Sequence, residues 1–206
     1  MQRFQRIATL IFAFFIFFAN SVFADQVQDP VQQLKHMLSQ IEKDVSGKQS
    51  DLQSNPEQIY QIVQKDLMPY MAMDRLSGMA LGPKWSHASK AQRDAFVRQF
   101  SRMLTRAYTG ALLKVTEYHI VINPLRDNAW KTATQLSVSG NVVPKSGGEP
   151  TAVTYYLVRQ GNAWLIYDFA VQGISIMRNF QTQFQGFADI AAVIARIQEV
   201  NEEDGN

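Results

Sequence analysis

The sequence contains no cysteine, and this absence excludes several kinds of site at once. Disulfides, thiolate nucleophiles, iron–sulfur clusters and cysteine-ligated zinc all require the missing residue. A chain of 206 residues can still bury a core large enough to fold without covalent crosslinks. The fold therefore depends on packing.

Recognisable catalytic and metal-binding patterns are also missing. The histidines His36, His87 and His119 do not have the spacing of a zinc site. The sequence has no nucleophile elbow, no phosphate-binding loop and no dinucleotide fingerprint. We therefore expect no catalytic residue, no metal and no cofactor.

Beyond its first 24 residues, the chain has no excess of positive or negative charge. The whole chain has 20 basic and 18 acidic residues, and two of the arginines, Arg3 and Arg6, lie in the first 24 residues. Residues 25–206 therefore hold 20 − 2 = 18 basic and 18 acidic residues, a formal net charge of zero. Nothing in this balance indicates a nucleic acid partner.

The longest hydrophobic run follows those two arginines, over residues 7–19. Val22 and Ala24 then occupy positions −3 and −1 of a cleavage site. This order predicts a secretory signal peptide over residues 1–24 and a single mature domain over residues 25–206. A membrane anchor is the alternative, but the run is short for a membrane span.

The first half of the mature chain has helical periodicity. Asp29 before Pro30 is a helix start, and Ser89 with Gln92 forms a capping box. The apolar spacing predicts helices over residues 30–45, 56–67 and 90–113, with a loop over 47–55.

The second half has the alternation of strands. Strands are predicted over residues 115–122, 130–143, 151–159 and 164–171, joined by short turns that favour an antiparallel meander. Gly173 ends the last strand, and Ser175 can cap a following helix. The prediction is an α+β fold in which a curled antiparallel sheet of about four strands is packed by N-terminal and C-terminal helices.

Three features have both a functional and a structural interpretation. The methionines and aromatic side chains are either ordinary core or the wall of an adaptable apolar pocket. Asp168, beside Tyr155 or Tyr167, is either a general base in an apolar site or a carboxylate satisfied by an arginine or by backbone amides. The stripe Arg98, Arg102 and Arg106 is either a partner-docking patch or a solvated helix face.

Three stretches of the sequence are distinctive: LMPYMAMDRLSGMALGPKW at 67–85, QRDAFVRQFSRMLTRAYTGALL at 92–113 and AWLIYDFAVQGISIMRNFQTQF at 163–184. Together they resemble the MlaC family of periplasmic phospholipid-binding proteins, also called the toluene-tolerance family. The Tyr-Asp-x-x-x-x-Gly-Ile-Ser segment from Tyr167 to Ser175 is the most specific part. Phe180 stands where a tyrosine is frequent in the family, a change that keeps the aromatic ring.

The resemblance implies a function as well as a fold. It implies a curled sheet reminiscent of NTF2-like folds around a lipid pocket, with phospholipid as cargo. It also implies a location in the periplasm and two partners, an inner-membrane ABC transporter complex with an MCE subunit and an outer-membrane lipoprotein–porin complex. Such a carrier would maintain the lipid asymmetry of the outer membrane. The alternatives are an NTF2-like enzyme on an apolar substrate and a periplasmic adaptor or chaperone without a ligand.

Helical and strand phase, combined with the resemblance, predict the residues of the pocket. We expect one lipid-binding cavity to be lined by Phe100, Leu104, Tyr108, Leu136, Tyr155, Leu157, Phe169, Ile174, Met177 and Phe180. Gly173 is either a hinge for the helix over the pocket mouth or only the residue that permits a tight turn.

Overall fold

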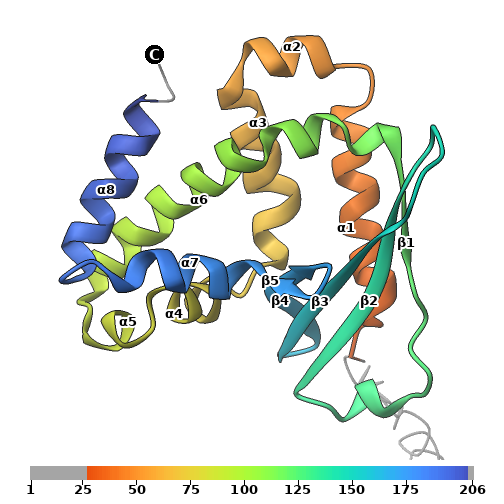
Figure 1. The fold of residues 1–206 in the computed structure, drawn as a ribbon. Helices are drawn as coiled ribbons and strands as arrows, with labels where there is room; N and C mark the ends of the chain where they lie inside the picture. Colours follow the sequence, from red (N-terminus) through yellow and green to blue (C-terminus); the bar gives the residue numbers. More distant parts are fainter. Residues whose placement is uncertain (1–26, 204–206) are drawn as a thin grey trace, which may run out of the picture.

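The computed structural model describes residues 27–203, so the predicted signal peptide lies outside the described residues. Helices occupy both ends of the described chain, and the sheet lies between them in sequence (Figure 1). The helices are α1 (Pro30–Val45), α2 (Gln49–Ser54), α3 (Pro56–Ile62), α4 (Met73–Leu81), α5 (Pro83–His87), α6 (Lys90–Leu113), α7 (Ile176–Gln185) and α8 (Ile190–Glu203). The strands are β1 (Tyr118–Ile122), β2 (Gln135–Pro144), β3 (Thr151–Gln160), β4 (Ala163–Val171) and β5 (Ile174–Ser175).

Two short helical turns continue from α3. A π-helical turn, η1 (Val63–Leu67), follows α3 directly, and a 3-10 turn, η2 (Met68–Tyr70), follows η1. Proline at position 69 lacks the N–H that a continuing helix would need, so the chain changes direction here. Met71 then forms a parallel bridge to Ile166 of β4, and the Ala72 N–H donates to the Ile166 carbonyl at 2.8 Å.

The sheet is an antiparallel meander in the order β1-β2-β3-β4-β5, which confirms the predicted topology and the α+β class. One irregularity interrupts it between β3 and β4. Tyr156 pairs with Asp168, but Leu157 pairs with Ile166, so Tyr167 is an extra residue in β4. Such a bulge bends the strand and resets which side chains face the core.

The predicted helix starts are confirmed in atomic detail. Asp29 Oδ1 accepts from the N–H of Val31 at 2.8 Å and of Gln32 at 3.3 Å. Ser89 and Gln92 form the reciprocal capping box at the start of α6. These bonds satisfy amide groups that have no partner within the helix.

Some predicted boundaries are wrong. The predicted loop over 47–55 contains the short helix α2, which the burial of Leu52 anchors to the core. The strands β1 and β2 begin later than predicted, because 3-10 turns occupy Val115–Glu117 and Ala129–Lys131. The sheet also has a fifth strand, β5, of two residues.

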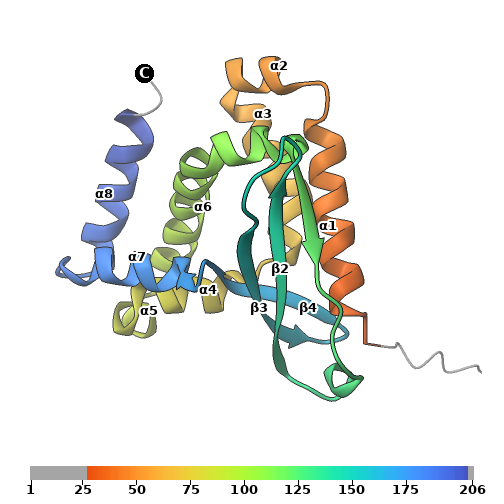
Figure 2. The same ribbon diagram turned by 45° about the vertical axis from the view of Figure 1, so that its right-hand side comes forward.

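Buried side chains form two separate hydrophobic cores. The first, which we call the sheet core, joins α1 to the sheet and includes Leu34, Met37, Val138, Leu157 and Trp164. The second, the helical core, joins α4, α6, α7 and α8 and includes Leu76, Phe96, Phe100, Met177 and Val193. In both ribbon views the sheet and α1 lie on one side and α4, α7 and α8 on the other (Figures 1 and 2). None of the helices over residues 27–203 has the length and apolar character needed to cross a membrane.

Candidate functional site

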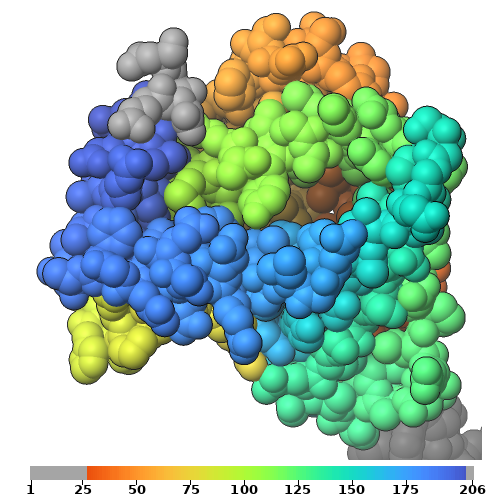
Figure 3. Space-filling view, in the orientation of Figure 1, coloured from red at the N-terminus to blue at the C-terminus, as the bar shows by residue number. Residues whose placement is uncertain are grey.

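A cavity of about 680 Å³ lies where the two cores meet. Its wall combines residues packed against the sheet core, such as Ile120 and Tyr155, with Leu104 and Met73 from the edge of the helical core. Met71 packs against both cores. A hollow is visible on the surface between the end of α6, in green, and the light-blue and teal strands of the sheet (Figure 3).

Helix α1 and the turns that follow α3 form the base of the cavity. Met37, Leu38 and Ile41 lie on one face of α1, as a spacing of three to four residues requires. Val63 and Leu67, at the two ends of the π-helical turn, contribute further apolar surface together with Met68. Methionine and leucine side chains give this base an adaptable apolar character.

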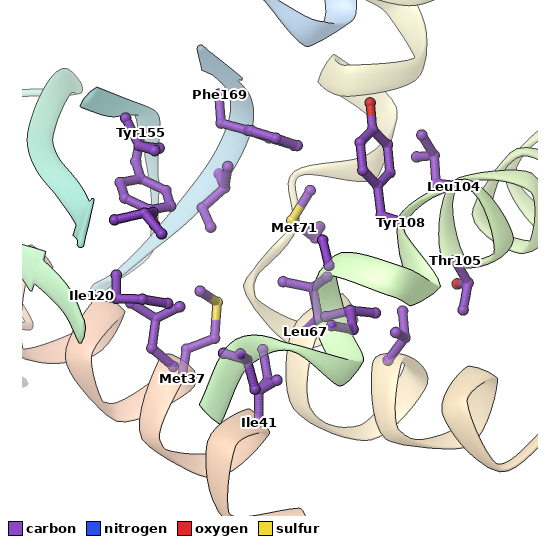
Figure 4. Close-up of a pocket in the computed structure, with 18 of the residues that line it drawn as sticks. Met37, Ile41, Leu67, Met71, Leu104, Thr105, Tyr108, Ile120, Tyr155 and Phe169 are labelled. Carbon is purple, nitrogen blue, oxygen red and sulfur yellow. The ribbon is translucent and has the colours of Figure 1, made fainter. Parts of the chain in front are cut away.

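Helix α6 forms one side wall, to which Leu104 and Tyr108 contribute (Figure 4). Two hydroxyl groups on this wall are already engaged with the backbone. Ser101 Oγ donates to the Val97 carbonyl at 2.7 Å, and Thr105 Oγ1 donates to the Ser101 carbonyl at 2.8 Å. The wall therefore behaves as a largely apolar surface.

The sheet forms the opposite wall, where Tyr155 and Phe169 face Leu104 and Tyr108 across the cavity (Figure 4). Tyr155 of β3 pairs with Phe169 of β4, and Val153 pairs with Val171. Cross-strand partners share a face, so all four side chains point into the cavity. Burial raises the pKa of Tyr155 to about 12 and also raises the pKa of Tyr108.

Charge is almost absent from the wall. Among the lining residues within 27–203, Lys114 alone carries a full charge, and its side chain is exposed at the end of α6. An apolar chamber with a cation at its solvent side is suited to an amphipathic molecule that carries an anionic group.

The structure brings together four of the ten residues predicted for the pocket. Leu104, Tyr108, Tyr155 and Phe169 line the cavity. Leu136 and Leu157, which pair across β2 and β3, face the same side of the sheet but pack into the sheet core beyond the cavity.

The other four predicted residues do not line the cavity, so the prediction that they share it is wrong. Phe100, Met177 and Phe180 belong to the helical core, where the Phe100 and Phe180 rings meet edge to face at 5.0 Å. Ile174 is 67% exposed. Met177 and Phe180 lie in the helical core because α7 packs along α4 (Figure 1).

The prediction missed the base of the cavity. Met37 and Ile41 of α1, Leu67 of the π-helical turn and Met71 were not among the expected lining residues, although all four line it. The methionine-rich stretch was a usable signal for Met71. The contribution of α1 depends on tertiary contacts between the N-terminal helix and the sheet, and helical phase alone does not select it.

Asp168 has a structural role and does not line the cavity. Its side chain is buried and accepts from Ser175 Oγ at 2.5 Å and from the Met177 N–H at 3.1 Å. Ser175 in turn accepts from the Arg178 N–H at 3.0 Å. The carboxylate thus fixes the first turn of α7 to β4, so the interpretation of Asp168 as a general base in the pocket is wrong.

The arginine stripe is divided by contacts within the chain. Arg102 lies 3.5 Å from Glu57 and 4.5 Å from the ring centre of Tyr60, both on α3. Arg106 is partly buried, and its Nη1 has no hydrogen-bond partner among the described residues. Arg98 is exposed. Docking through this face stays a prediction, and Arg98 is the member best placed for it.

Gly173 lies at the turn between β4 and β5. Gln172 has φ 50° and Gly173 has φ 80°, and Val171 pairs with Ile174 across them. Two residues with positive φ are what a tight hairpin turn of this kind requires. A role as a hinge stays a prediction.

No group of three or more histidine or acidic side chains that could hold a metal ion is present between residues 27 and 203.

The sequence is similar to those of known proteins. The model of a family described as "MlaC protein" matches residues 35–199. The chain is 24% identical over 179 residues to the intermembrane phospholipid transport system binding protein MlaC of Haemophilus influenzae, with 82% of this chain and 81% of that protein covered. It is 26% identical over 159 residues to the toluene tolerance protein ttg2D of Pseudomonas putida, with 76% and 72% covered.

A solved structure has the same fold. It is the phospholipid-binding protein from Ralstonia solanacearum in complex with a phospholipid. The TM-score is 0.77 at 23% sequence identity, and the match covers 87% of this chain and 100% of that one.

Proposed function

This chain belongs to the MlaC protein family, and on that premise we propose that it is a phospholipid carrier that holds acyl tails in the cavity between its two cores. The observation that carries the proposal is the cavity itself, about 680 Å³ of apolar space. Relatives named as phospholipid transport and toluene tolerance proteins support the same function.

The physical need for such a carrier follows from the hydrophobic effect. Each buried methylene costs about 0.8 kcal/mol to expose to water, so a lipid with roughly 30 methylenes costs on the order of 25 kcal/mol. Free transfer through water is therefore negligible. A carrier needs no chemistry to lower this cost, because it only has to keep the tails out of water while the head group stays near the solvent.

The proposed setting is the periplasm, reached through the predicted signal peptide over residues 1–24. There the mature domain, residues 25–206, would carry phospholipid between an inner-membrane ABC transporter complex with an MCE subunit and an outer-membrane lipoprotein–porin complex. The relatives' names support a lipid transport system as the context. Arg98 is the proposed electrostatic contact to these partners. An enzymatic role gains no support from Asp168, because its carboxylate caps α7.

Extraction with organic solvent followed by mass spectrometry tests the proposal. We expect the purified mature domain to release diacyl phospholipid in a fixed molar ratio. Leu104→Trp, which fills part of the cavity, should lower that ratio at least severalfold. The matched control is Ala107→Trp on the same helix, because Ala107 is exposed and does not line the cavity. A folded wild-type protein free of lipid, or equal lipid in both variants, would contradict the proposal.

A further inference from the structure

Three tyrosines line the cavity from three different elements, Tyr108 on α6, Tyr118 on β1 and Tyr155 on β3. None of their hydroxyl groups has a hydrogen-bond partner within the described part of the chain. Burial raises the pKa of Tyr155 to about 12 and also raises the pKa of Tyr108. Tyr155 is half-buried, and its hydroxyl is not among the fully enclosed side-chain atoms that lack a partner, so the oxygen is accessible to what enters the cavity.

The Tyr155 hydroxyl is a permanent donor in an otherwise apolar wall. With a pKa of about 12 it keeps its proton at every physiological pH. The neighbouring hydroxyls of Ser101 and Thr105 are already engaged with backbone carbonyls of α6. No acceptor among the described residues bonds to Tyr155, so its partner is what fills the cavity, either water or a bound ligand.

Two acceptors are available on a phospholipid, and they differ in the cost of burial. A phosphate is charged, and burying it away from a counter-ion is costly. The one charged side chain on the described wall, Lys114, is exposed, so it suits a phosphate that stays near water. An ester carbonyl is neutral and is joined directly to the acyl tail, so it can enter an apolar chamber with the tail.

We propose that the Tyr155 hydroxyl donates a hydrogen bond to an ester carbonyl oxygen of the bound lipid, so that the carrier selects ester-linked over ether-linked tails. This inference rests on the proposed function and adds the chemical feature of the cargo that the cavity recognises. An ether-linked lipid has the same tails and head group but lacks the carbonyl acceptor.

The test compares two lipids on three proteins. The lipids are dipalmitoyl phosphatidylglycerol and its di-O-hexadecyl ether analogue, and the dissociation constant of each is measured on delipidated wild type, Tyr155→Phe and Tyr156→Phe. Tyr156 is the matched control, because it neighbours Tyr155 on the same strand, does not line the cavity and packs with Tyr167 at 6.2 Å between ring centres.

We expect wild type and Tyr156→Phe to bind the ester lipid about 2- to 12-fold more tightly than the ether lipid, the range given by one net hydrogen bond. In Tyr155→Phe this ratio should fall to about one, with the loss confined to the ester lipid. An ester-to-ether ratio that is the same in Tyr155→Phe and wild type overturns the inference and assigns Tyr155 to packing or to a bound water. A wild-type protein that binds neither lipid overturns the proposed function itself.

Discussion

Asp66 lies on the π-helical turn whose ends line the cavity, and its side chain is 5% exposed. Lys65 Nζ lies 3.5 Å from Asp66 Oδ1 and 2.6 Å from Asp44 Oδ2 on α1. The second oxygen, Asp66 Oδ2, has no partner among the described residues. Burial, and then the neighbouring Asp44, raise the pKa of Asp66, whereas the hydrogen bond from Lys65 lowers the pKa of Asp44.

These shifts predict how Asp66→Asn changes stability with pH. A raised pKa means that Asp66 supports folding fully below its unfolded value of 3.8 and loses this contribution as pH rises through the folded pKa. The pKa of Asp44 is lowered mainly by Lys65, which both proteins keep. Asn keeps the shape without the charge, so at pH 7 we expect the variant to be more stable by about 1 kcal/mol, the scale of one hydrogen bond.

Urea unfolding of both proteins at several pH values between 4 and 7 measures this effect. The advantage of the variant should grow as pH rises above 3.8 and become constant once the pH exceeds the folded pKa of Asp66. A difference that does not change with pH would show that Asp66 has the same affinity for its proton in the folded and unfolded chains.

Asp168 gives a second prediction at the scale of one side chain. Asp168→Ala removes the acceptor for Ser175 Oγ and leaves the buried Met177 N–H unpaired, so unfolding should require about 3 kcal/mol less free energy. The control is Asp189→Ala, which removes a similar but exposed bond to the Ala192 N–H and should cost about 1 kcal/mol. Thermal unfolding measures both. Equal losses in the two variants would be inconsistent with the burial of Asp168.

The residues of the cavity were only partly predictable. Tyr155 and Phe169 follow from strand alternation in β3 and β4, although the bulge at Tyr167 lies only two residues before Phe169. Phe100 lies one helical turn before Leu104, and phase gives both the same face of α6. The structure separates them because the face of α6 crosses from the helical core to the cavity between these two residues. The position of that crossing depends on where α7 packs. The periodicity of the sequence does not predict where α7 packs.

At the scale of elements, the turn between β4 and β5 connects the sheet to α7. Gly173 has φ 80°, and a Cβ built there meets nothing within 4 Å, so a larger residue is opposed by backbone conformation alone. Gly173→Ala should therefore cost about 1–2 kcal/mol of stability, whereas Gly173→Asn should cost much less, because asparagine tolerates this conformation.

If the turn also acts as a hinge, the same pair of variants reveals it. We expect Gly173→Ala to hold phospholipid but to release it several times more slowly to acceptor vesicles, with Gly173→Asn close to wild type. Transfer of a fluorescent phospholipid to vesicles measures the rate. Normal release by a folded Gly173→Ala protein would leave Gly173 with the turn as its only role.

The elements themselves were predictable where local chemistry marks their ends. The helix over 90–113 was predicted with its observed bounds, because the capping box at Ser89 fixes its start. The helix α2 was missed, because its sequence QSDLQS is polar except for Leu52. Leu52 is buried in the sheet core, and that contact is not local.

At the scale of the whole molecule, the cavity separates the two cores that stabilise the fold. The sheet core contains α1 and the strands, and the helical core contains α4, α6, α7 and α8. Acyl tails in the cavity would contact Met37 and Tyr155 on one side and Leu104 and Met73 on the other. The acyl tails would then fill the space between the cores and pack against both.

This arrangement predicts that lipid couples the unfolding of the two cores. Separate cores open separately, and hydrogen exchange of backbone amides measures the free energy of each opening. In the delipidated protein, we expect the opening free energy of α7 and α8 to differ from that of α1 and β4 by more than 1 kcal/mol. Dipalmitoyl phosphatidylglycerol at 100 times its dissociation constant should raise the lower value by about 2.7 kcal/mol and bring the two together.

Hydrogen exchange followed by mass spectrometry reports both cores in the unmodified chain. Dihexanoyl phosphatidylglycerol is the matched control, because it has the same head group but tails too short to fill the space between the cores. It should leave the two opening free energies apart. Equal protection of both cores without lipid, or stabilisation of one core alone by the long-chain lipid, would mean that the tails do not join them. The expected result would make the stability of the fold depend on its cargo, so that a carrier that has delivered its lipid opens more readily at the cavity than a loaded one.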